Sequence, residues 1–311
     1  MTTTDPLSGS DQRISVVIPH LNQPEYLHNC LTSLAKGKVQ ADEIIVVDNG
    51  SRDLPREVCA AFANVTLLTE ATPGPGPARN RGVAASTGGI LAFIDADCLA
   101  SPDWLAVAQA EMADPAAQIL GGDVRIAWVD PQRLTMLEAY EAIYAYRMDR
   151  YIAREGFTGT GNLVVRRDVL DKVGPFAGLD VAEDRDWGQR ATRAGYVIRF
   201  VEEMKAYHPA RPSFRDLVVK WERATAHDYI KARQTSGGRL SFAVKALAIG
   251  LTPLAEVPRI IGSDRVSGVK NKLLALACLT CIRLCRARIM LRLLTGTDPA
   301  VYSGAWNRAK L

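Results

Sequence analysis

The sequence predicts an α/β fold in which a mainly parallel, doubly wound sheet is followed by a helical C-terminal region. Between residues 14 and 105, short runs of Val, Ile and Leu alternate with amphipathic stretches in the order strand, helix, strand. Uninterrupted apolar strands indicate a sheet covered by helices on both faces. From residue 213 onward, the pattern of apolar and charged residues is helical. Together these observations favour one α/β domain with a helical appendage.

The expected elements follow the chain in that order. Strands are predicted at 14–19, 43–51, 65–70 and 88–98, and helices at 25–37, 55–63 and 77–87. The middle region contains a helical stretch at 134–154, the turn GTGN, the short strand LVVRR and the acidic segment AEDRDW. We therefore expect a flexible N-terminus (1–12), a domain at 13–212 with halves at 13–105 and 106–212, and a helical region at 213–311.

Composition narrows the class of protein. The chain has 311 residues, of which 48% are hydrophobic and 23% charged, as in ordinary globular proteins. A net charge of +4 is too small to indicate a nucleic-acid partner, and none is expected. The N-terminal segment MTTTDPLSGSDQR is polar, so no signal peptide is predicted and a cytoplasmic location is expected. The six cysteines are then expected to be thiols.

Carboxylates follow two of the predicted strands. Asp95 and Asp97 come directly after the apolar run ILAFI, and residues two apart on a strand face the same side. Two like charges would repel, and a divalent cation relieves that repulsion. Asp48 follows the second strand, and ligands of such sheets bind at the carboxyl ends of the strands. The alternatives are a strand-end turn for Asp95 and Asp97 and a tight Asp-Asn-Gly-Ser loop for Asp48.

The segment PGPGPARNRG resembles a dinucleotide-binding glycine motif only superficially. Arg79 occupies the third glycine position, and its three prolines lack the N–H groups that would bind a pyrophosphate. We therefore reject that interpretation. Arg79 and Arg81 could instead place guanidinium groups near the carboxylates, or they could be solvated side chains at a helix start.

The acidic segment AEDRDW carries Glu183, Asp184 and Asp186 in four positions. A charged helix N-terminus, with Asp186 paired to Arg190 one turn later, is the simpler explanation. A carboxylate in a cleft can also serve as a general base toward a hydroxyl group. Trp187 could support a sugar ring or pack in the interior.

Histidine and cysteine residues offer further candidate metal ligands. His208, in AYHP, becomes a candidate only if it faces the carboxylates, because imidazole is a common ligand. Cys278, Cys281 and Cys285 have a similar spacing to some metal sites but lie in an apolar helical pattern. We expect these cysteines to be core or interface residues.

Taken in order, these motifs resemble those of the family 2 glycosyltransferases, which are inverting enzymes with a GT-A fold. The resemblance covers roughly residues 15–209. VVIPHLNQPEYL is similar to the first strand and loop, VVDNGSRD to the nucleotide-binding aspartate loop and PARNRGVAAS to the Arg-Asn-x-Gly helix. FIDADC is similar to the metal-binding D-x-D, GTGNLVVRR to the acceptor-side segment, AEDRDWGQR to the motif with the catalytic base, and AYHP to the late histidine.

The resemblance implies a donor and metal site in the first half of the domain. It assigns Asp48 and Arg79 to the nucleotide base, Asp95 to the ribose or the metal, Asp97 to Mn²⁺ or Mg²⁺, and His208 to the metal. Pro19 and Asn22 of the first strand and loop join the donor-binding set. Leu21 stands where the family usually has an aromatic residue, which predicts weaker stacking on the base. A UDP-sugar is the favoured donor.

The same resemblance implies the acceptor side and the reaction. Asp184 becomes the general base, and Asn162, Glu183 and Trp187 become acceptor contacts. We expect one inverting displacement onto a hydroxyl of a glycan or lipid-linked acceptor in polysaccharide or glycolipid assembly. A sugar nucleotidyltransferase is the first alternative, but PHLNQPEY lacks the glycine-rich basic loop that it needs. A catalytically silent scaffold is the second, against which the full set of acids argues.

The C-terminal third has no motif of its own. Its apolar stretches are interrupted by Lys and Arg before they reach the length of a membrane-spanning helix. Basic amphipathic helices of this kind lie on anionic membrane surfaces, where a lipid-linked acceptor would be presented. Packing on the sheet and a dimer interface remain open alternatives.

Overall fold

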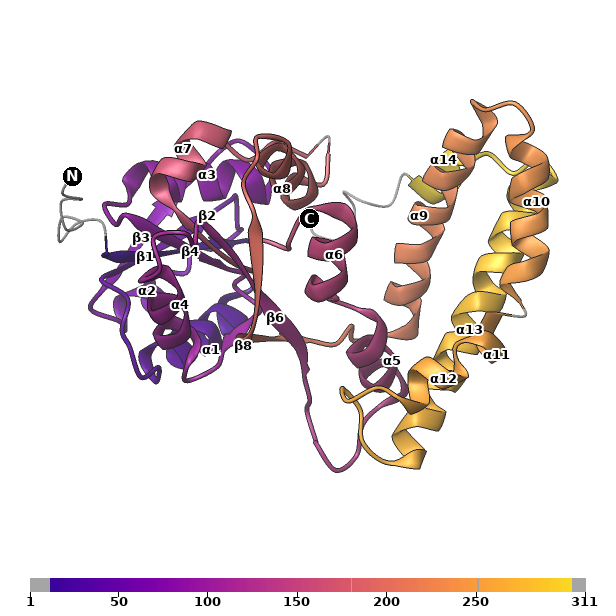
Figure 1. Ribbon diagram of the computed structural model, residues 1–311, viewed down its shortest axis with the longest axis horizontal. Helices are drawn as coiled ribbons and strands as arrows, with labels where there is room; N and C mark the ends of the chain where they lie inside the picture. The colour runs from indigo at the N-terminus through magenta and orange to yellow at the C-terminus, as the bar shows by residue number, and fades with distance from the viewer. Residues whose placement is uncertain (1–11, 180, 251, 304–311) are drawn as a thin grey trace, which may run out of the picture. The chain divides into compact units, whose positions relative to one another are not determined.

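The computed structural model describes residues 12–179, 181–250 and 252–303 (Figure 1). It divides into two compact units, the first formed by Met1–Ala127 with Tyr146–Pro209 and the second by Trp128–Ala145 with Ala210–Leu311. The segment expected to be a flexible N-terminus lies outside the described residues except for residue 12.

The first unit is built on a mixed sheet with the order β3-β2-β1-β4-β7-β6-β8-β5. Its strands are β1 (Ile14–His20), β2 (Glu43–Asp48), β3 (Val65–Thr69), β4 (Ile90–Ile94), β5 (Leu99–Ala100), β6 (Ile119–Ala127), β7 (Asn162–Arg166) and β8 (Ile198–Pro209). The first four are mutually parallel, whereas β7 runs antiparallel to both β4 and β6. The predicted fold class is confirmed.

Helices cover both faces of this sheet (Figure 1). They are α1 (Pro24–Ala35), α2 (Arg56–Ala60), α3 (Pro75–Ala85), α4 (Trp104–Met112), α6 (Met148–Glu155), α7 (Arg167–Val173) and α8 (Glu183–Arg193). Because side chains alternate along a strand, Val16 and Ile18 of β1 pack in the core under α1, α2 and α4, whereas Val17 packs on the α3, α7 and α8 side. This double covering explains why the strands read as continuous apolar runs.

The second unit is helical. Its helices are α5 (Met136–Tyr144), α9 (Phe214–Arg233), α10 (Gly238–Ile249), α11 (Thr252–Ala255), α12 (Val257–Ile261), α13 (Val269–Leu294) and α14 (Ala300–Ser303). Tyr229 of α9, Phe242 of α10 and Met290 of α13 form part of its core. Among the helices that the structure describes, none is long and apolar enough to cross a membrane.

The expected helix at 134–154 is two helices that belong to different units. The chain leaves α5 at Ala145, and Tyr146 adopts a left-handed φ of 48° before α6 begins. Thr135 and Glu138 form a capping box at the start of α5, and the helix buries Tyr140 and Ile143 in the second unit. The first unit is therefore interrupted at 128–145, and its end lies at residue 209 rather than 212.

Candidate active site

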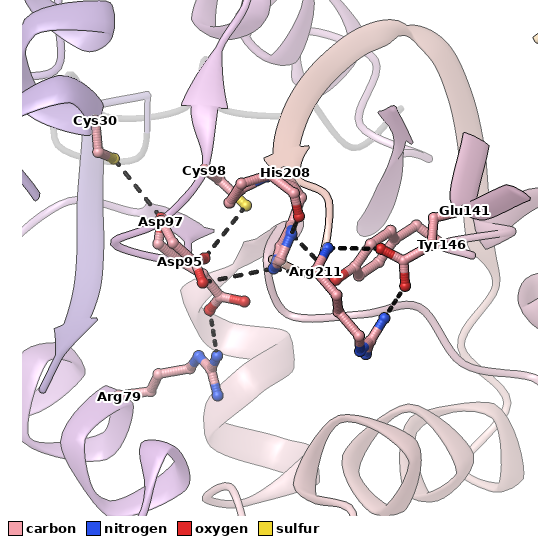
Figure 2. Close-up of polar contacts among 10 residues, drawn as sticks. Cys30, Arg79, Asp95, Asp97, Cys98, Glu141, Tyr146, His208 and Arg211 are labelled. Carbon is pink, nitrogen blue, oxygen red and sulfur yellow. Dashed lines mark hydrogen bonds and ion pairs between the residues drawn. The ribbon is translucent and has the colours of Figure 1, made fainter. Parts of the chain in front are cut away.

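The D-x-D loop is positioned by two strands that are far apart in the sequence. Asp95 follows β4, and the Cys98 N–H donates to its carbonyl oxygen at 2.9 Å. Directly afterwards, Leu99 of β5 pairs with Tyr207 of β8 in antiparallel register. This pairing brings His208 beside the loop, with its Nε2 3.5 Å from Oδ2 of Asp97 (Figure 2).

The residues at this loop have the chemistry of a divalent-cation site. Asp95, Asp97 and Cys98 offer ligand atoms that all lie within 4.8 Å of one another. Burial and the two carboxylates raise the pKa of Cys98, so its sulfur is a protonated thiol. Mn²⁺ and Mg²⁺ prefer carboxylate oxygens, and Mn²⁺ also accepts imidazole. By their chemistry, Asp95 and Asp97 therefore suit such an ion better than Cys98 does, and His208 lies beside Asp97.

The hydrogen bond on the far side of His208 determines which ring nitrogen is available. Nδ1 lies 2.7 Å from the carbonyl oxygen of Pro209, which can only accept a hydrogen bond. In the neutral ring, Nδ1 therefore carries the proton and the lone pair of Nε2 is directed toward Asp97. This arrangement is typical of metal-binding histidines. The Tyr146 hydroxyl lies 3.1 Å from both ring nitrogens, a contact that the sequence pattern did not indicate.

Glycine allows β7 to approach the first carboxylate closely. A Cβ on Gly161 would lie 2.7 Å from Oδ2 of Asp95, closer than real Cβ contacts allow. A side chain at position 161 would therefore displace the Asp95 carboxylate at the D-x-D loop. Asn162, the next residue, is fully buried and its side chain accepts from Trp104 and donates to the carbonyl oxygens of Asp123 and Met204. The structure therefore gives Asn162 a structural role in place of the expected acceptor contact.

Arg79 connects the D-x-D loop to the start of α8. Its side chain is buried, with one terminal nitrogen 2.6 Å from Asp95 and the other 2.9 Å from Glu183. Burial alone would lower the pKa of Arg79, but the two carboxylates outweigh it and raise that pKa. Arg79 is thus a fixed cation beside the site. Glu183 is held by this ion pair, which leaves its expected acceptor contact a prediction.

Asp184 occupies the first turn of α8. Its carboxylate accepts from the Arg185 N–H at 2.7 Å and is half-buried. Burial raises the pKa of Asp184, and the neighbouring charge of Glu183 adds to the effect. A raised carboxyl pKa strengthens a general base. Trp187, one turn later, is buried beside Phe176 and donates to the Gly174 carbonyl, so it packs rather than presenting a face to a sugar.

Asp48 lies buried at the end of β2 and is fixed by a histidine that sequence reasoning missed. Parallel register places His20 opposite Asp48, with His20 Nδ1 2.9 Å from Oδ1. His20 Nε2 accepts the Gln23 N–H at 3.1 Å, so Nδ1 carries the proton and donates to Asp48. Burial alone would raise the pKa of Asp48, but hydrogen bonds from Ser51 and His20 outweigh it and lower that pKa. The parallel register of β1 and β2 could have indicated that His20 lies opposite Asp48.

The first loop is tied to the Asp48 loop. Pro19 pairs with Val47 in the sheet, and Asn22 follows with a left-handed φ of 53°. The Asn22 N–H donates to the Ser51 hydroxyl at 2.7 Å, and its side-chain oxygen accepts the Arg52 N–H at 2.9 Å. Both expected donor-side residues therefore lie next to Asp48, at the same sheet edge as the D-x-D loop.

Known proteins resemble this chain in sequence. The family described as Glycosyl transferase family 2 matches residues 15–174. Glycosyltransferase AglE of Haloferax volcanii is 35% identical over 228 residues, which cover 71% of this chain and 72% of that protein. The pre-mycofactocin glycosyltransferase of Mycobacterium tuberculosis is 27% identical over 234 residues, covering 69% of this chain and 47% of that protein.

Solved structures share the fold at lower identity. The mannosyltransferase PcManGT from Pyrobaculum calidifontis, in complex with GDP-Man and Mn²⁺, is 17% identical, with a TM-score of 0.56 over 95% of this chain and 88% of that one. S. aureus TarS 1–349 in complex with UDP-GlcNAc is also 17% identical, with a TM-score of 0.52 over 96% and 92% of the two chains. The GT-A type fold is confirmed, and the chain belongs to glycosyl transferase family 2.

Proposed function

We propose that this glycosyltransferase moves a sugar from a nucleoside-diphosphate donor to a hydroxyl acceptor in a metal-assisted, inverting displacement. One observation carries the proposal: β5 and β8 bring the Asp97 carboxylate and the His208 imidazole together beside Asp95. The similar structures of PcManGT and TarS were solved with nucleotide sugars, and PcManGT with Mn²⁺. These complexes support a nucleotide-sugar donor here.

Asp48 is suited to recognise the donor base. Its lowered pKa keeps the carboxylate ionised, so it accepts hydrogen bonds and does not donate one. Uracil and guanine both present a ring N–H that such an acceptor recognises, so Asp48 is compatible with a UDP- or a GDP-sugar, and a UDP-sugar stays the favoured donor. Pro19 and Asn22 border the same site, and Asp95 is available to the ribose or the metal.

The charge that develops on the departing diphosphate needs a positive counterpart. Asp95, Asp97 and His208 would hold Mn²⁺ or Mg²⁺, which when bound stabilises that charge. Arg79 keeps Asp95 in place through a bond of 2.6 Å. Its buried guanidinium also adds a fixed positive charge to the site.

Asp184 supplies the base. As the acceptor oxygen forms its bond to C1 of the sugar, the bond from C1 to the diphosphate oxygen breaks and the nucleoside diphosphate leaves with the electron pair. The acceptor proton passes to the Asp184 carboxylate. Attack from the face opposite the leaving group inverts the anomeric carbon in one step. A glycan or a lipid-linked sugar would supply the hydroxyl.

The test combines donor binding with turnover. The full chain is titrated by calorimetry with UDP- and GDP-sugars, with and without Mn²⁺, and nucleoside diphosphate release is measured in parallel. We expect metal-dependent binding of one donor, lost in Asp97→Asn and kept in the control Asp103→Asn, whose carboxylate pairs with Lys38 on the surface. If no nucleotide binds in a metal-dependent way, the proposal is wrong. Binding without turnover on any acceptor would identify a silent scaffold.

A further inference from the structure

The longest helix of the second unit leaves one apolar face uncovered. Leu273, Leu284 and Leu291 of α13 are 59%, 55% and 46% exposed. Their spacings of eleven and seven residues place them on one side of a helix with 3.6 residues per turn. Cys278 and Ile282, on the opposite side, are buried. We call Val269, Leu273, Leu284 and Leu291 the α13 face.

Small side chains continue the α13 face between Leu273 and Leu284, and the exposed Arg288 lies beside it between Leu284 and Leu291. Ala277 and Cys281, which are also exposed, fill the space between Leu273 and Leu284. At a rise of 1.5 Å per residue, the face from Leu273 to Leu291 is roughly 27 Å long. At its N-terminal end, Val269 and Leu273 join Ile261 of α12 in lining an apolar groove. Such a long exposed apolar surface indicates a partner.

The charges of this region are almost all positive. The segment from Gly238 to Leu294 contains ten Lys and Arg residues and only two carboxylates, Glu256 and Asp264. α13 itself carries six of the cations and no acid. Lys270 and Arg288 are exposed along the border of the α13 face, and Arg292 is exposed in the last turn. The partner should therefore be apolar and anionic at once.

Two other partners fit this surface less well. A second copy of the chain, bound through the same face, would bring the cations of the two α13 helices against each other, and like charges repel. A nucleic acid would meet the cations, but its affinity comes mainly from phosphate contacts and leaves a row of leucines unused. A lipid surface accommodates both the apolar and the cationic side chains, because leucines enter the acyl boundary while Lys and Arg remain among anionic headgroups.

We propose that the α13 face binds an anionic lipid bilayer, with the helix lying in the plane of the interface. This inference goes beyond the proposed reaction and does not depend on it. It also explains the composition of α13. This helix is apolar on two sides, and without a lipid partner one of those sides would be exposed to water.

The experiment is vesicle flotation with the full chain. Vesicles of phosphatidylcholine alone are compared with vesicles of equal parts phosphatidylcholine and phosphatidylglycerol, and the bound fraction is measured at low and high salt. We expect binding to the anionic vesicles only, weakened by salt. Leu284→Gln/Leu291→Gln should weaken it by roughly ten-fold or more. Arg288→Gln/Arg292→Gln should weaken it by about five-fold per cation.

Matched variants and a second measurement distinguish failure of the lipid-binding proposal from failure of the proposed reaction. Leu240→Gln/Leu247→Gln removes two exposed leucines from α10, whose opposite side packs in the core with α13, and should leave flotation unchanged. The proposal is overturned if the wild type ignores anionic vesicles, if the α10 variant loses as much binding, or if the α13 variant converts a dimer to a monomer without lipid. Calorimetric donor binding by the first unit should be equal in all variants, and its failure would count against the proposed reaction only.

Discussion

The candidate site of the first unit and the helices α10 and α13 of the second unit use charge in opposite ways. In the first unit, the buried guanidinium of Arg79 is matched by Asp95 and Glu183, and the buried carboxylate of Asp48 by His20. In the second unit, α10 and α13 both carry cations, and neither helix contains an acidic residue. Buried pairs fix atoms to a fraction of an ångström, as bond-making requires. A surface that carries charge of only one sign does not hold individual atoms in place, but it attracts an extended partner of the opposite charge.

The largest effect we predict is on catalysis. Asp184→Asn should lower kcat by about 10²- to 10⁴-fold, because the amide cannot accept the acceptor proton. Donor affinity should change little, since Asp184 is on the acceptor side of the proposed site. The control is Asp186→Asn on the same helix turn, whose carboxylate only pairs with Arg190. An equal loss of kcat in both variants would mean that the structure of the start of α8, and not a general base at Asp184, determines the rate.

The pH profile of the wild type tests the same assignment. A general base works only when ionised, and burial raises the pKa of Asp184 above the ordinary value of an aspartate. The rate at limiting substrate should therefore rise with pH through that raised pKa and then level off. A rate that is already at its plateau at the ordinary pKa of aspartate would contradict the assignment.

The next effect is on stability. Arg79→Met removes the buried cation between two carboxylates, and breaking a buried ion pair costs about 3–5 kcal/mol. We expect the lower end, about 3 kcal/mol, because Asp95 and Glu183 keep partial access to water. Chemical denaturation measures the free energy of unfolding. Arg81→Met, an exposed position on the same helix, should change it by less than about 0.5 kcal/mol.

His20→Ala should lower the free energy of unfolding by about 1–3 kcal/mol, because it leaves the buried Asp48 carboxylate without one of its donors. Donor affinity should fall as well, since Asp48 is no longer fixed. His28→Ala is the control, at an exposed position of α1. If His20→Ala kept full stability and donor affinity, the pair would be incidental to the site.

Asp184→Asn should also stabilise the protein at neutral pH. A raised carboxyl pKa means that the folded state favours the protonated form, so ionisation opposes folding at pH values above the folded pKa. Below the ordinary aspartate pKa both states are protonated and that penalty is absent. The Tm of the variant should therefore exceed that of the wild type at neutral pH and converge with it on acidification. A constant difference at all pH values would contradict this cause.

Residues whose position follows from the chain direction could be placed from the sequence. Asp48 ends β2, Asp95 and Asp97 lie just beyond β4, and parallel strands bring their ends to one edge of the sheet. Asn162 and Trp187 were placed on the acceptor side, yet both are buried, because an amide and an indole satisfy internal donors and acceptors as readily as a ligand.

The separation of residues 128–145 from the first unit could not be predicted from the sequence either. The stretch 134–154 has the sequence pattern of one helix, although its backbone leaves the helical region from Ala145 to Arg147. What assigns α5 to the helical unit is the burial of Tyr140 and Ile143 there. Contacts between segments so far apart in the sequence leave no periodic signal, whereas strand ends do. This is why the sheet edge at which these carboxylates meet could be predicted from the sequence and the unit boundary could not.

The smallest predicted effect separates the two sides of a single helix. Leu247→Gln on α10 should change the free energy of unfolding by less than about 0.5 kcal/mol, because this side chain is 71% exposed and Gln matches Leu in helix propensity. Phe242→Ala, on the packed side, should cost about 3–5 kcal/mol because it leaves a cavity beside Tyr229. Denaturant titration of both variants measures the contrast. Comparable losses would mean that the outer side of α10 is packed in the folded protein, and that exposed apolar residues of this unit contribute to its core.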